Sequence, residues 1–72
     1  MSRSEVARLR RQIELECESI HLAMYGYAAV ARHQIIEHKY NALGEYQEQL
    51  ETLVGEEEAA NIVRDTYIKV IG

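Results

Sequence analysis

The feature that most constrains this chain is an apolar stripe that returns every three or four residues over its first 42 positions. This spacing is the period of an α-helix and not of a β-strand, and no polar turn cluster interrupts it before residue 41. It predicts one long helix over about residues 4–42, with a possible kink at Gly26. The stripe consists of Leu9, Ile13, Cys17, Ile20, Met24, Ala28, Ala31, Ile35, His38 and Ala42.

A second apolar stripe begins at Leu22 and continues through Tyr25, Ala29, Ile36, Tyr40 and Leu43. At about 100° per residue it lies roughly 120–180° around the helix from the first stripe. A helix that is apolar on two sides has to be covered on both, and residues 45–71 can cover only one of them. We therefore expect a homodimer, in which small side chains near Gly26 allow close approach. The expected interface residues are Ile20, Met24, Gly26, Tyr27, Val30, Ala31, Ile35 and Tyr40.

The chain after residue 42 is expected to form a short helical hairpin folded over the long helix. The segment 43–50, Leu-Gly-Glu-Tyr-Gln-Glu-Gln-Leu, is similar to the helix–turn–helix junction of a tetratricopeptide repeat, which implies a turn at Gly44. Gly55 fits the position just past the end of one helix, with the next helix starting at Glu56. The alternative fold is a compact three-helix bundle, in which the long helix breaks at 25–27.

Length and composition indicate one all-α domain over residues 1–72, with residues 1–5 as a frayed basic arm. Proline is absent and 47% of the residues are hydrophobic, which disfavours both strand-rich and disordered chains. Apolar burial in a single chain is worth about 110 kcal/mol, against about 108 kcal/mol of ordering entropy. Cys17 is the only cysteine and cannot form a disulfide within one chain. A second chain is therefore the expected source of stability.

Charge is distributed unevenly along this acidic chain, whose net charge is −4. The N-terminal segment carries Arg3, Arg8, Arg10 and Arg11, whereas residues 40–63 carry six glutamates and no basic residue. These two segments can pair with each other, pair between chains, or stay solvated. The net charge disfavours general attraction to nucleic acid or to anionic lipid. The chain shows no signal-peptide pattern and no apolar run of membrane-spanning length, and its lone cysteine fits a reducing compartment, so we expect it in the cytoplasm.

Two pairs of metal-ligating residues occur along the expected helix. Glu18 and His21 have the Glu-x-x-His spacing of helix-bundle di-iron carboxylate proteins, and His33 and Glu37 are four residues apart. The helical wheel argues against one shared ion, because His21, His33 and His38 point roughly 120° apart. We therefore expect no metal and no cofactor, and keep a metal-binding helical bundle as an alternative.

No catalytic constellation emerges from the sequence. Cys17 lies in the apolar stripe, where burial raises the pKa of a thiol and leaves it inert, and no glycine-rich phosphate loop is present. The favoured function is therefore a small cytoplasmic protein–protein interaction or adaptor protein without catalytic activity, which binds itself and another protein. The alternatives are the metal-binding bundle and a regulator that binds or mimics nucleic acid through a charged segment.

Overall fold

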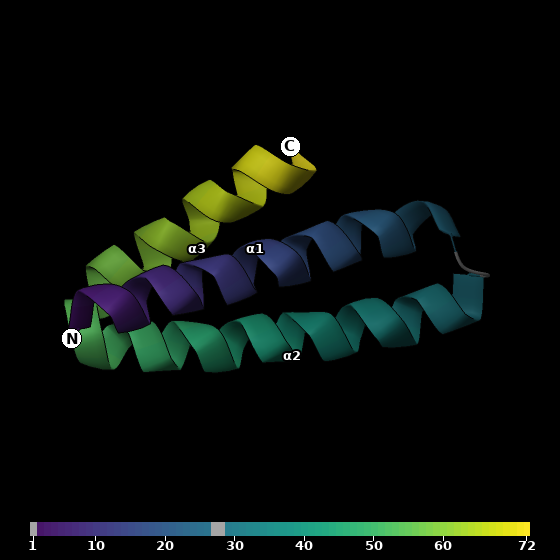
Figure 1. Cartoon of the computed structure of the whole chain (residues 1–72). Coiled ribbons are helices and arrows are strands. Elements are labelled where there is room, and N and C mark those ends of the chain that lie inside the picture. Colours follow the sequence, from purple (N-terminus) through teal and green to yellow (C-terminus); the bar gives the residue numbers. More distant parts are fainter. Residues whose placement is uncertain (1, 27–28) are drawn as a thin grey trace.

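The fold is a bundle of three helices, shown by a computed structural model (Figure 1). The structure describes residues 2–26 and 29–72, and within them the side chains of 3–25 and 33–72. Helix α1 spans Ser2–Gly26, α2 spans Ala29–Val54 and α3 spans Glu56–Ile71, and the described ranges hold no strand. The all-α prediction is confirmed, in the form of the three-helix bundle that was the alternative.

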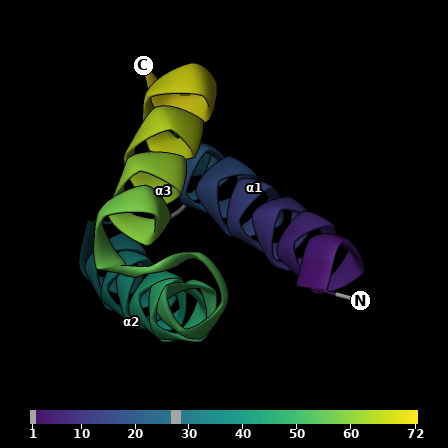
Figure 2. The same cartoon turned by 90° about the vertical axis from the view of Figure 1, so that its left-hand side faces the viewer.

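Helices α1 and α2 form a long antiparallel hairpin, and α3 packs across one half of it (Figures 1 and 2). The hairpin helices have 25 and 26 residues, whereas α3 has 16. Because α3 is shorter, it ends beside the middle of the hairpin (Figure 1). Near its C-terminal end, α3 reaches Leu22 of α1, since Val70 and Leu22 line one groove. The part of the hairpin beyond this point, residues 23–26 and 29–36, is called the open end below.

The core consists of the first apolar stripe of α1, packed against both other helices. Leu9, Ile13, Cys17 and Ile20 recur every three or four residues along α1 and are all buried. This spacing places them on one face of the helix, as the sequence predicts. The residues that complete this core from α2 and α3 are Leu43, Leu50, Ala59 and Ile62.

The prediction of one helix over 4–42 is wrong, because α1 ends at Gly26 and the next helix begins at Ala29. Residues 27 and 28 lie outside the described part of the chain. The physical reason is that α2 folds back and covers the first stripe of α1 with apolar residues of the same chain. A single 72-residue chain thereby forms its own buried core, which an extended helix could obtain only from a second copy.

The predicted turn at Gly44 is also wrong, because α2 passes through this residue without a break. Leu43 and Leu50 are both buried in the core, and their seven-residue spacing keeps them on one face of a continuous helix. Gly44 itself is exposed, and a Cβ atom there would meet nothing within 4 Å. The helix therefore tolerates this glycine without depending on it.

The N-terminal segment differs from its prediction as well. Residues 2–5, expected as a frayed basic arm, belong to the first turn of α1. Glu5 lies in that turn, where the helix dipole favours a negative charge.

Gly55 confirms the predicted helix boundary and forms the whole connection between α2 and α3. Its φ of 92° and ψ of 163° belong to a region that only glycine enters readily. The Gly55 amide donates to the Glu51 carbonyl at 3.0 Å, and its own carbonyl accepts from the Ala59 amide at 3.0 Å. Gly55 alone therefore separates the end of α2 from the start of α3.

These two glycines allow a matched test of the fold. We expect Gly44→Ala to stabilise the protein by about 1 kcal/mol, because alanine is the better residue inside an exposed helix. Gly55→Ala should instead destabilise it by about 1–3 kcal/mol, because alanine is strained at this φ and ψ. Chemical denaturation of both variants measures the two changes. A loss of stability in Gly44→Ala would contradict a continuous α2.

Candidate functional site

The four metal-ligand candidates occupy two separate places on the surface. Glu18 and His21 line a shallow groove of about 380 Å³ between α1 and the C-terminal end of α3. His33 and Glu37 line another, of about 410 Å³, on α2. Within the described part of the chain, no three His, Cys, Asp or Glu side chains come together as metal ligands would. The structure therefore brings together each pair but not the four residues.

His21 is the half-buried member of the first pair. Its Nδ1 atom is buried without a hydrogen-bond partner, and its ring centroid lies 5.4 Å from that of Tyr25, at an angle of 59°. Tilted ring pairs at this separation attract each other. Glu18, which is exposed, makes no hydrogen bond to this Nδ1 atom.

The basic segment and the acidic one approach each other at Arg10 and Glu58, which line one groove of about 200 Å³ between α1 and α3. Arg3, Arg10 and Arg11 line an open groove on α1, which also contains Glu14. Arg11 donates to Glu14 at 2.7 Å, and Lys69 of α3 lies 3.8 Å from the same carboxylate. No ion pair between described side chains joins these arginines to the glutamates of residues 45–58. The suggestion that the two segments pair within one chain is therefore not supported by any such contact.

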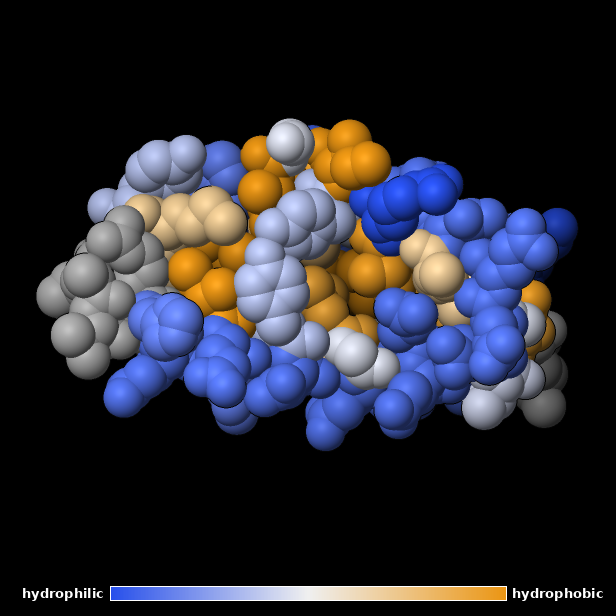
Figure 3. All heavy atoms as spheres, turned by 180° about the vertical axis from the view of Figure 1, so that it is seen from behind, coloured by the Kyte–Doolittle hydropathy of each residue, from blue (hydrophilic) through white to orange (hydrophobic). Residues whose placement is uncertain are grey.

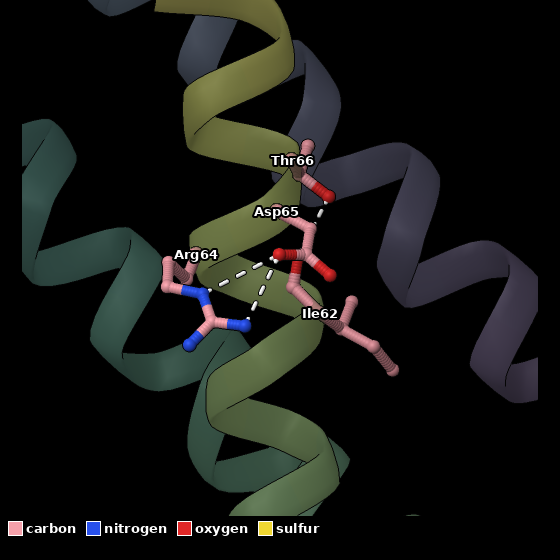
Figure 4. Close-up of polar contacts among 4 residues, drawn as sticks. All are labelled: Ile62, Arg64, Asp65 and Thr66. Atoms are coloured by element: carbon pink, nitrogen blue, oxygen red, sulfur yellow. Dashed lines mark hydrogen bonds and ion pairs between the residues drawn. The ribbon is translucent and has the colours of Figure 1, made fainter.

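Two further ion pairs lie elsewhere on the bundle. Lys39 of α2 approaches Glu16 of α1 at 3.7 Å, which links the two hairpin helices. On the outside of α3, Arg64 and Asp65 pair at 3.3 Å, and the Thr66 hydroxyl donates to the Ile62 carbonyl at 2.8 Å (Figure 4). The Arg64–Asp65 pair is exposed, and exposed pairs contribute little to stability.

Cys17 is fully buried in the core, as its place in the stripe predicts. Burial raises the pKa of its thiol, and the negative charges of Glu16 and Glu14 raise it further. The thiol is therefore protonated at neutral pH, and it is not positioned as a nucleophile.

Tyr40 and Tyr67 join α2 to α3 through their side chains. Their hydroxyl oxygens lie 2.5 Å apart, and their ring centroids are 6.1 Å apart. The hydrogen bond between the two hydroxyls, which holds the Tyr40 proton, and, second, burial raise the pKa of Tyr40 to about 12. Sequence reasoning placed Tyr40 in an interface but missed this pair. The two tyrosines lie at similar distances in sequence before and after Gly55. If α2 and α3 are expected to fold back on each other at Gly55, this symmetry predicts that the two side chains meet.

The predicted interface residues have different environments in the single chain. Ile20 is fully buried in the chain's own core, so it is not available to a second copy. Met24 packs against that core, Ile35 is half-buried and Tyr40 is exposed. Gly26 is the last residue of α1. Tyr27 and the side chains of Val30 and Ala31 lie outside the part that the structure describes.

Among the side chains that the structure describes, the most exposed large apolar ones are on α1, near and within the open end. Leu22 is 69% exposed and Tyr25 is 80% exposed, and both belong to the second stripe of the sequence. On another face of the molecule, hydrophobic side chains form a visible band between hydrophilic regions (Figure 3). Several apolar side chains of this bundle therefore remain uncovered.

Comparison of the chain with family models, with characterised proteins and with solved structures found no match. Among the described residues, no helix combines the length and the apolar character needed to cross a bilayer.

The tyrosine pair makes a testable prediction about alkaline pH. Because the folded protein holds the Tyr40 proton more tightly than the unfolded chain, whose pKa is near 10, the pair stabilises the fold fully below about pH 10. That contribution is lost as the pH rises through about 12. Absorbance titration of tyrosinate should show one group with this high pKa. Tyr67→Phe should return it toward 10, and an unchanged titration would contradict the contact.

Proposed function

We propose that this protein is a small cytoplasmic protein–protein interaction or adaptor protein that acts as a homo-oligomer and has no catalytic activity of its own. The observation that supports this proposal is the exposure of Leu22 and Tyr25 on α1. Large apolar side chains that cluster on a surface are typical of protein–protein contacts. The lone, buried Cys17 fits a reducing compartment such as the cytoplasm.

The surface area of the chain also favours association. The protein exposes 5033 Å², whereas a compact monomer of 8.3 kDa exposes about 4,600 Å². The excess follows from the shape, which measures 41 × 19 × 19 Å, and from the short α3, which leaves the open end without a third helix. Contact with another chain along α1 would remove the exposed apolar surface of Leu22 and Tyr25 from water, which is the main favourable term in association.

Sedimentation equilibrium tests this proposal. We expect a dimer at micromolar concentration, and a melting temperature that rises with protein concentration because dissociation and unfolding are coupled. Leu22→Ser should shift the equilibrium toward the monomer without disturbing the core, since Leu22 is exposed in the single chain. Ile68→Ser is the matched control, because Ile68 is 57% exposed but lies on α3. A species of 8.3 kDa at every concentration would contradict the proposal.

A further inference from the structure

The outward face of α1 carries a stripe with the spacing of a coiled-coil seam. Two series of residues, each with a period of seven and offset by three, run along it, and all six side chains are exposed. Apolar residues with this spacing mark the a and d positions through which paired helices contact each other; here Leu15, Leu22 and Tyr25 are apolar, whereas the other three side chains are charged. The members of this stripe, called the outer stripe below, are Arg8, Arg11, Leu15, Glu18, Leu22 and Tyr25.

The outer stripe points away from the rest of its own bundle. On a helical wheel it is centred roughly 180° from Ile13, which is fully buried in the core. The other helices pack mainly on the Ile13 side, and the C-terminal end of α3 reaches the edge of the outer stripe, where Val70 lines a groove with Glu18 and Leu22. At about 1.5 Å per residue, the stripe from Arg8 to Tyr25 is about 26 Å long. Another helix could therefore lie along it.

Charge along the outer stripe favours one orientation for a second copy of the same helix. Positive charge lies at Arg8 and Arg11, and negative charge at Glu18. Parallel pairing would place each charge beside its own copy, which is repulsive. Antiparallel pairing instead places the arginines of each chain toward the glutamate of the other, so the stripe is complementary to itself in this direction.

On the basis of the proposed function, we propose that α1 pairs antiparallel with α1 of a second copy along the outer stripe. The two-fold axis passes between residues 16 and 17. Arg8 then faces the ring of Tyr25 of the second copy, a favourable arrangement of a cation on an aromatic face. Leu22 packs along the aliphatic part of Arg11 of the second copy, whose guanidinium reaches toward Glu18 of the first. Each contact occurs twice because the interface is symmetric.

Charge reversal followed by compensation tests this arrangement. Glu18→Arg and Arg11→Glu should each weaken the dimer at least about tenfold, because each places like charges together twice. The double variant Arg11→Glu/Glu18→Arg should recover most of that loss, since it exchanges the charges within both Arg11–Glu18 contacts of the symmetric dimer. Glu48→Arg is the control, because Glu48 is an exposed glutamate on α2 outside the outer stripe. Sedimentation equilibrium gives the dissociation constants.

The outcomes distinguish this inference from the proposed function. Arg11 also pairs with Glu14 within its own chain, so circular dichroism of dilute samples must show that each variant keeps its helices. A wild-type dimer that none of the reversals weakens would overturn the outer stripe as the interface and leave self-association standing. Single variants that weaken the dimer without recovery in the double variant would overturn the antiparallel orientation. A monomeric wild type would overturn both.

Discussion

The structure depends on the burial of one apolar face of α1 by two other helices of the same chain. Ile13, Cys17 and Ile20 are completely covered, so this face cannot also contact another molecule. Burial of several such side chains stabilises the fold by about 1.5–3 kcal/mol each, which exceeds any of the surface ion pairs. Because this face of α1 must be buried, α2 runs back along it and α3 packs beside it. The opposite face of α1 therefore points outward.

Much of this arrangement could be predicted from local sequence patterns. The three- and four-residue spacing from Leu9 to Ile20 identified both the helix and its buried face, and Gly55 identified the boundary between two helices. The return of the chain after Gly26 is predicted only as the alternative fold, because the flanking tyrosines and alanines lack the residues that usually form turns. The hairpin is favoured over a straight helix because it buries an apolar core within one chain.

Gly44 shows why a local sequence signal can mislead. Gly44 is followed by polar residues and resembles a turn, yet Leu43 and Leu50 both need the core, and this requirement keeps the helix intact. The two pairs of metal-ligand candidates have the spacing of neighbours on a helix, but this spacing does not predict how far apart the two pairs lie in space. Glu18 and His33 belong to different helices with different neighbours, and only the folded chain shows this.

Because Gly55 alone connects α2 to α3, its backbone conformation determines whether α3 packs on its own hairpin or on that of another copy. If Gly55 took helical φ and ψ values, Ala29–Val54 and α3 would become one straight rod, and α3 would leave its own hairpin. Its apolar face could then dock only on the hairpin of another molecule, which is the geometry of a domain swap. The φ of 92° therefore does more than end a helix: it makes α3 fold onto its own molecule.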